Sequence, residues 1–158
     1  MQEQRKQFVE FQLGKGEFAL LPAKQIIEIK RLKVEDIVPV PQLPSCILGV
    51  CQWRGNTLWL IDLGELIRLS PLTWSNSNFI LVLLVEEKTI GLVVPKVKGI
   101  NYYDIEELLE PSEAFFNPEL IPYLEGFFLS QDREIIRVLK PEAIIQFDSR
   151  SVFAVDSF

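Results

Sequence analysis

The stretch LGVCQWRGNTLWLIDL, from Leu48 to Leu63, has an apolar arm on each side of a short polar segment. Within that segment Gly55 is followed by Asn56, a pair typical of a tight reversal in which the backbone takes positive φ angles. The stretch therefore predicts a β-hairpin. Its second arm, Leu58–Ile61, is apolar at four successive positions, so we expect a central strand covered on both faces.

Arg54 stands at the tip of this predicted hairpin, one residue after the large aromatic Trp53. Arginine carries five N–H donors in a planar fork, and tryptophan is enriched at the centres of protein interfaces. Both residues are therefore candidates for partner binding. A solvated surface arginine and a core tryptophan are the alternative interpretations.

The composition is that of a globular protein, with 48% hydrophobic and 24% charged residues in a chain of 158. The net charge is −6 and the basic residues are scattered, which predicts no nucleic-acid partner. The longest apolar run, Phe79–Val85, is shorter than the about 20 residues that a spanning helix needs, and no signal-like segment follows Met1. We therefore expect a cytoplasmic protein without direct membrane insertion. Cys46 and Cys51 are expected to be buried free thiols.

Four hairpins are predicted from apolar runs separated by turn residues. They lie at 8–21, 48–63, 79–95 and 123–139. In the first, Val9, Phe11 and Leu13 share one face while Glu10 and Gln12 share the other, the alternation typical of a strand.

The remaining segments are predicted to be short. We expect strands at 34–40 and 97–102, helical turns at 64–68 and 142–145, and a helix or a loop at 104–110. The segment 23–30 favours a turn of helix that continues as a strand. The polar stretch 69–78 is the most loop-like and is interpreted as a crossing between subdomains, and the tail 148–158 is expected to be loose.

A weak internal repeat relates two parts of the chain. The segment Phe18–Pro22, which closes the first hairpin, is similar to Ile90–Pro95, which closes the third. In the same way Gly49 stands near the start of the second hairpin and Gly126 near the start of the fourth. Two similar halves of about five strands each predict two small β-barrels packed together. The predicted fold is mainly β with a few short helices, in one domain.

Histidine-dependent catalysis is excluded because the sequence contains no histidine. A histidine general base, a histidine metal ligand and a phospho-accepting histidine are all impossible. A Gly-rich phosphate loop, a CxxC pair and a GxSxG elbow are also missing. The acidic run Asp104–Glu107 favours a solvated face over a carboxylate pair. We therefore predict a protein that is not an enzyme, uses no metal or cofactor, and acts by binding.

The sequence resembles the CheW family, the coupling proteins of bacterial chemosensory arrays, in pieces that extend from Gln7 to Ile145. These pieces are Phe8–Gly14, Glu17–Leu20, Pro44–Val50, Gln52–Gly55, Leu58–Leu63, Gly91–Val94, Tyr123–Gly126 and Ile135–Leu139. In that family the turn usually reads Asn-Leu-Arg-Gly, so Gln52 and Trp53 are departures, and Pro95 replaces a usual aspartate.

The resemblance implies a single CheW-like domain over residues 1–158, made of two interleaved five-stranded SH3-like barrels. It also implies a non-catalytic adaptor between the cytoplasmic tip of a methyl-accepting receptor, or a photoreceptor, and the regulatory domain of a CheA-type histidine kinase. The system served would be chemotaxis, phototaxis or pilus-based twitching.

Carried over by position, the resemblance implies a specific set of partner-binding residues. They are Ile26, Glu28, Ile29, Gly49 and Arg54, and the turn residues Trp53 and Gly55 on either side of Arg54 complete the predicted partner-binding set. Glu28 would lie across from Arg54, and the two would form a polar rim beside an apolar groove that receives an amphipathic helical hairpin. Two other functions remain open: a peptide-binding β-barrel module outside chemosensing, and a hydrolase that uses the run Asp104–Glu107.

Overall fold

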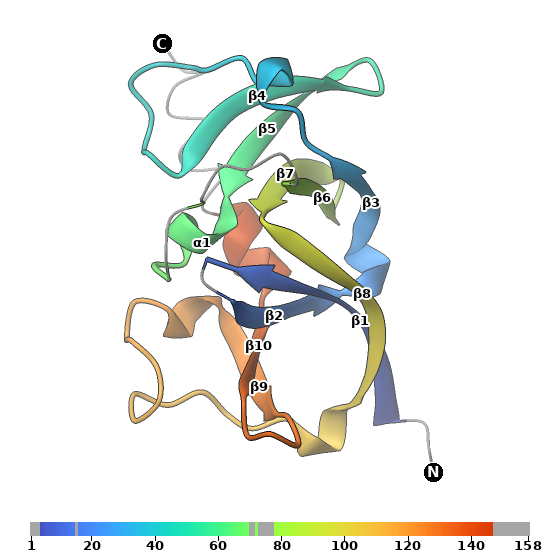
Figure 1. Ribbon diagram of the computed structural model, residues 1–158, viewed down its shortest axis with the longest axis vertical. Helices are drawn as coiled ribbons and strands as arrows, with labels where there is room; N and C mark the ends of the chain where they lie inside the picture. Colours follow the sequence, from blue (N-terminus) through green and yellow to red (C-terminus); the bar gives the residue numbers. More distant parts are fainter. Residues whose placement is uncertain (1–3, 15, 70–71, 73–77, 147–158) are drawn as a thin grey trace.

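The computed structural model describes residues 4–14, 16–69, 72 and 78–146, and within them ten strands form two five-stranded sheets. Figure 1 shows the two sheets as separate units, one above the other. Unit A has the strand order β8-β1-β2-β10-β9, with β1 at Arg5–Leu13, β2 at Glu17–Pro22, β8 at Lys96–Asp104, β9 at Leu124–Leu129 and β10 at Ile135–Leu139. Unit B has the order β3-β6-β7-β5-β4, with β3 at Ile26–Arg31, β4 at Ile47–Trp53, β5 at Asn56–Asp62, β6 at Phe79–Val85 and β7 at Lys88–Val94.

The two units repeat one topology. Each contains one parallel pair, β2 with β10 in unit A and β7 with β5 in unit B, and its other pairs are antiparallel. A short helix follows the parallel strand in both cases, α1 (Leu63–Leu66) after β5 and residues 141–146 after β10. The predicted mainly β fold with two five-stranded SH3-like subdomains is thereby confirmed.

In each unit the two edge strands are not paired with each other by a ladder of backbone hydrogen bonds. In unit B one bridge joins β4 to the segment after β3, with Val38 N–H donating to Val50 O at 2.7 Å and Val50 N–H donating back at 2.9 Å. In unit A the matching bridge joins Leu109 and Phe127, at 2.8 and 2.9 Å. We call the gap between β3 and β4 the unit B seam, and the gap between β8 and β9 the unit A seam. The units are thus curled sheets joined across each seam by one bridge, not fully bonded barrels.

Two glycines permit these bridges. A Cβ atom on Gly49 would lie 2.3 Å from the Val38 carbonyl oxygen, and one on Gly126 would lie 2.5 Å from the Leu109 carbonyl oxygen. Gly49 also has a φ of +141°, which side chains rarely adopt. Each glycine follows a shift in the strand register, so the repeat seen in the sequence corresponds to one local structure built twice.

Three apolar clusters fill the molecule. The largest lies between the units and includes Phe11 from β1 and Leu81 from β6. A second lies inside unit B around Leu60, and a third lies inside unit A around Phe8 and Phe128. The shared cluster fixes the two units against each other, because removing large apolar side chains from water is the main stabilising term in folding.

Several sequence predictions need correction. The strand expected at 34–40 is instead the 3-10 turn η3 (Val34–Asp36), because its backbone N–H groups bond locally and only Val38 joins the sheet. The crossing expected near 69–78 lies elsewhere: β5 and β6 both belong to unit B, and the chain changes unit at η2 (Ala23–Gln25) and between β7 and β8. Most of that stretch and the tail 148–158 lie outside the described residues.

The other short elements occur near their predicted places. Asp62 caps α1, accepting a hydrogen bond from the Glu65 backbone N–H at 3.3 Å. The acidic run forms the 3-10 turn η4 (Ile105–Glu107), and η5 (Ile121–Tyr123) leads into β9. Glu10, which the alternation of β1 placed on the polar face, is nevertheless buried, because that face points into the curled sheet of unit A.

Candidate functional site

The turn between β4 and β5 positions the arginine picked out from the sequence. Trp53 pairs with Asn56, so Arg54 and Gly55 are the two central residues, with φ angles of +51° and +79°. Two positive φ angles define a type I′ turn, whose twist matches that of the flanking strands. The positive angles expected from the Gly55–Asn56 pair therefore fall one residue earlier. The turn holds the Arg54 side chain 60% exposed at the tip of the hairpin.

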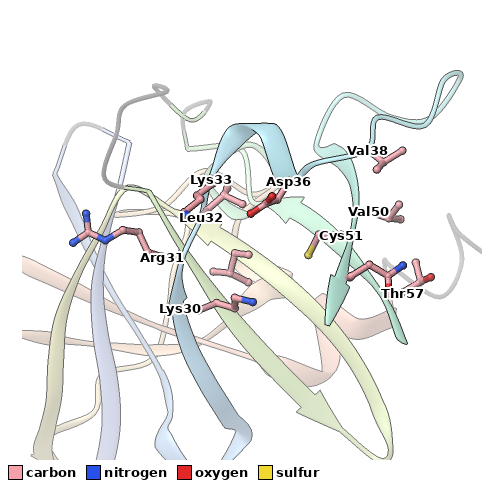
Figure 2. A pocket seen from close by; sticks show the side chains of 11 residues that line it. Lys30, Arg31, Leu32, Lys33, Asp36, Val38, Val50, Cys51 and Thr57 are labelled. Atoms are coloured by element: carbon pink, nitrogen blue, oxygen red, sulfur yellow. The ribbon is translucent and has the colours of Figure 1, made fainter. Parts of the chain in front are cut away.

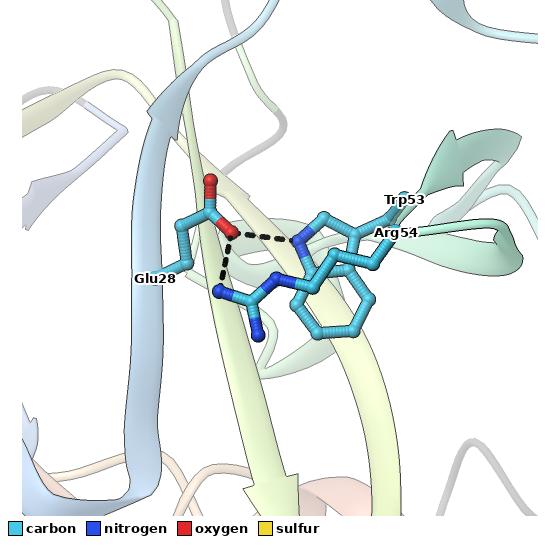
Figure 3. Close-up of polar contacts among 3 residues, drawn as sticks. All are labelled: Glu28, Trp53 and Arg54. Atoms are coloured by element: carbon cyan, nitrogen blue, oxygen red, sulfur yellow. Dashed lines mark hydrogen bonds and ion pairs between the residues drawn. The ribbon is translucent and has the colours of Figure 1, made fainter.

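Three side chains meet on one carboxylate oxygen (Figure 3). Trp53 donates its indole Nε1–H to Glu28 Oε1 at 2.9 Å, and Arg54 Nη2 donates to the same oxygen at 3.2 Å. The guanidinium also lies over the Trp53 ring, with its central carbon 4.6 Å from the ring centroid. We call Glu28, Trp53 and Arg54 the seam cluster. The predicted pairing of Glu28 with Arg54 is present, and Trp53 joins it.

The seam cluster spans the unit B seam by side chains alone. Glu28 comes from the edge strand β3 and Trp53 from the end of the opposite edge strand β4, which pair with β6 and β5 and not with each other. The ion pair is exposed, at 60% for Arg54 and 34% for Glu28, and pairs of this kind contribute only about 0–1 kcal/mol to stability. The contact with Glu28 uses one of the five donors of Arg54. The cluster is therefore better suited to binding than to holding the fold together.

The structure does not bring the other predicted residues into this cluster. Ile26 is partly buried against the core between the units, and Ile29 is exposed on the opposite face of β3 from Glu28, since successive side chains alternate along a strand. Gly49 is buried and has the packing role described above. Gly55 belongs to the turn, where a side chain would meet open space.

A cavity of about 220 Å³ opens in the unit B seam beside the cluster (Figure 2). Its floor consists of Leu32, Cys51 and Ile80, all buried. Its wall on the β3 side carries Lys30, and Val38 stands exposed at the far rim. We call it the seam cavity. Sequence reasoning missed it because its lining comes from four different strands and η3.

The thiol on the floor of this cavity is held in its neutral form. Burial raises the pKa of Cys51 above its ordinary value, and the carboxylate of Asp36 adds to that rise, while the ammonium of Lys30 acts against it. Burial also raises the pKa of Cys46 to about 11, with the negative charge of Glu65 adding to the effect. Both cysteines are free and buried, as the sequence predicted.

The acidic run does not form a catalytic pair. Asp104 accepts a hydrogen bond from the Glu106 backbone N–H at 3.0 Å and so caps η4, while Glu106 and Glu107 lie exposed to solvent. A hydrolase would need such carboxylates to converge in a pocket. None of the helices in the described part of the chain combines the length and the apolar composition that spanning a bilayer requires.

The comparisons with known proteins agree with this architecture. A family model described as "CheW-like domain" matches residues 7–149. The chain belongs to the CheW-like domain family. The resemblance stated from the sequence is thereby confirmed, and with it the prediction that the chain is not an enzyme.

Individual relatives are distant but match over most of their length. A "Probable chemotaxis protein CheW" from Rhizobium etli is 26% identical over 144 residues, covering 88% of this chain and 86% of the relative. The "Chemotaxis protein CheW" of Klebsiella aerogenes is 23% identical over 134 residues, covering 84% of this chain and 78% of the relative. The crystal structure of "scaffolding protein TtCheW" from Thermoanaerobacter tengcongensis superposes with a TM-score of 0.75 at 22% identity, covering 85% and 84% of the two chains, and shows that the fold is shared.

Proposed function

We propose that this CheW-like chain is a non-catalytic scaffold that couples a methyl-accepting chemoreceptor to the regulatory domain of a CheA-type histidine kinase, in the cytoplasm. Membership of the family supports the scaffold role, and relatives named as chemotaxis proteins support the system in which it works. The same coupling would operate if the receptor were a photoreceptor, or if the system controlled pilus-based twitching.

The seam cluster is the observation that supports a binding site at the hairpin tip. Its guanidinium is exposed, is held in one orientation by the Trp53 ring and by Glu28, and has donors left for a partner. Fixing a long side chain before binding lowers the entropy that association must overcome. A partner carboxylate or carbonyl group that reaches the turn therefore meets a donor already in place.

The coupling itself follows from the rigidity of the molecule. The two units share one apolar cluster, so a partner on one unit and a partner on the other are held in a fixed relation. A change in the receptor then biases the kinase through a coupling free energy between the two binding sites. No reacting group on this chain is required.

The test is a charge reversal at Arg54 with a matched control in unit A. Arg133 also lies exposed in a hairpin turn at positive φ, +64°, so Arg133→Glu changes the same charge in a similar backbone. We expect Arg54→Glu to weaken binding to a receptor cytoplasmic fragment or to the kinase regulatory domain by tenfold or more, a cost of about 1.4 kcal/mol or above. Arg133→Glu is expected to bind like the parent, and thermal unfolding should show both variants folded.

Two results would contradict the proposal. One is parent protein that binds neither the receptor fragment nor the kinase domain at micromolar concentration, which would favour a peptide-binding module outside chemosensing. The other is Arg54→Glu protein that binds both partners as tightly as the parent does.

A further inference from the structure

The seam cavity has a size and a setting that suit one side chain. Along β4 it is bounded at one end by Trp53 of the seam cluster and at the other by the Val38–Val50 bridge. Its volume of about 220 Å³ is below the roughly 300–1,000 Å³ of sites for small-molecule ligands. An added strand would need a continuous free edge, which the bridge and the cluster interrupt. A helix that delivers a single anchoring side chain meets no such obstacle.

The inner face of β3 sets the character of the site. Glu28, Lys30 and Leu32 alternate along the chain and therefore point to the same side, toward the seam. Glu28 joins the seam cluster, Lys30 lines the cavity and Leu32 is buried in its floor. Figure 2 shows Lys30 directed between the strands on the side of Cys51, whereas the side chain of Arg31, which also belongs to the cavity lining, extends away from Cys51. The guanidinium of Arg31 lies over the Phe79 ring, 5.6 Å from its centroid.

The charge around the opening favours an acidic partner. Lys30, Arg31 and Lys33 line the cavity against one carboxylate, Asp36. Arg54 stands beyond them at the hairpin tip, paired with Glu28. The rest of the chain is acidic, with a net charge of −6, so this opening differs in sign from the molecule as a whole. Complementary charge of this kind orients a partner and excludes competitors.

We infer that the seam cavity receives one apolar side chain from a helical segment of the receptor, and that an acidic residue on that segment, one helical turn away, pairs with Lys30. The inference rests on the proposed function and adds to it the place and chemistry of the anchor. Residues one turn apart lie on the same face of a helix, so a single segment can present both groups. The buried floor supplies the apolar contacts and Lys30 supplies the charged contact.

The first test compares a lysine that lines the cavity with an exposed lysine in the other unit. Lys30→Glu changes the cavity, and Lys96→Glu makes the same charge change on an exposed residue of β8 in unit A. With the cytoplasmic fragment of a methyl-accepting receptor from the same genome, we expect Lys30→Glu to raise Kd roughly tenfold and Lys96→Glu to change it less than about twofold. An acidic-to-lysine change on the receptor segment should restore the affinity of Lys30→Glu.

The second test uses the two thiols as probes in one molecule. Iodoacetamide attacks the thiolate, so the reaction is run at alkaline pH. Saturating receptor fragment should then slow the modification of Cys51 severalfold, because Cys51 forms the cavity floor. The modification of Cys46, which lies outside the cavity, should proceed at an unchanged rate.

The outcomes separate this inference from the proposed function. If Arg54→Glu abolishes binding while Lys30→Glu binds normally, the scaffold proposal stands and the anchor in the seam cavity is refuted. An unchanged Cys51 rate with bound receptor fragment would also refute it. Protection of Cys51 by the kinase regulatory domain and not by the receptor fragment would assign the cavity to a different partner and overturn the inference.

Discussion

Units A and B share one topology but place their polar side chains differently. In unit B a carboxylate, Glu28, joins the two edge strands across the seam, and its side chain is still 34% exposed, so solvent and partners can reach it. In unit A a carboxylate, Glu10, lies inside the curled sheet at 4% exposure. It accepts hydrogen bonds from Tyr103 Oη at 2.6 Å and Asn101 Nδ2 at 2.9 Å, and Lys98 Nζ lies 3.8 Å away.

The difference separates polar groups that hold a fold from polar groups that are free to bind. The three partners of Glu10 all lie on β8, so the network ties that edge strand to its neighbour β1. Burial raises the pKa of Tyr103, and the hydrogen bond to Glu10 raises it further, so the phenol keeps its proton and remains a donor. A buried network of this kind is costly to break, whereas the exposed cluster of unit B is not.

The largest difference between the units is expected at the two bridge glycines, Gly49 and Gly126, where the same substitution should cost unequal amounts of stability. Gly49→Ala adds a Cβ 2.3 Å from the Val38 oxygen and also forces alanine to a φ of +141°, so we expect a loss of roughly 3–5 kcal/mol in the free energy of unfolding. Gly126→Ala meets a steric conflict with the Leu109 oxygen and the Leu108 side chain but no unfavourable φ angle, and it should lose about 1–3 kcal/mol. Urea denaturation of both variants measures the difference. Equal losses would show that the φ angle at Gly49 contributes nothing.

Removing the carboxylates of Glu10 and Glu28 tests whether the first stabilises the fold and the second serves binding. Glu10→Ala leaves the hydroxyl of the half-buried Tyr103 without its acceptor and should destabilise the protein by about 2–3 kcal/mol. Glu28→Ala removes an exposed pair and should cost less than about 1 kcal/mol while weakening partner binding. Denaturation curves and binding assays on the same samples test both statements. A Glu28→Ala protein that loses as much stability as Glu10→Ala would contradict the division of roles.

The smallest effect is expected at the turn between β6 and β7. Glu86 and Glu87 both have positive φ, +51° and +72°, in a hairpin where Val85 pairs with Lys88. Asparagine followed by glycine suits such a type I′ turn far better than two adjacent carboxylates do. Replacing the pair by Asn-Gly should stabilise the protein by about 1 kcal/mol, and a rise in Tm of a few degrees is the measurement. An unchanged or lower Tm would show that the two glutamates do not strain this turn.

Local patterns in the sequence predicted the hairpins and the repeat, because alternating and continuous apolar runs depend on neighbouring residues only. The pairing register of two strands depends on contacts along both of them, not on the turn residues alone. The positive φ angles therefore fall at Arg54 and Gly55 instead of at Gly55 and Asn56. The alternation in β1 placed Glu10 correctly on the face opposite Phe11, but a curled sheet buries both of its faces.

The candidate site was predictable only in part. Family resemblance placed Glu28 opposite Arg54, and the structure added the indole donor of Trp53, a residue that departs from the usual family turn. Nothing in the sequence could bring Lys30 and Cys51 to one cavity, because their strands are both at the edges of unit B and meet only through the curl of the sheet.

The order in which the chain builds its two units has a consequence for synthesis. Unit B is one uninterrupted segment, β3 to β7, whereas unit A combines the first two strands with the last three. During translation unit B therefore completes its sheet while β9 and β10 are still inside or near the ribosome. The early hairpin of β1 and β2 can pack its apolar face on the finished unit B through their common cluster, which protects it from aggregation until its partner strands arrive.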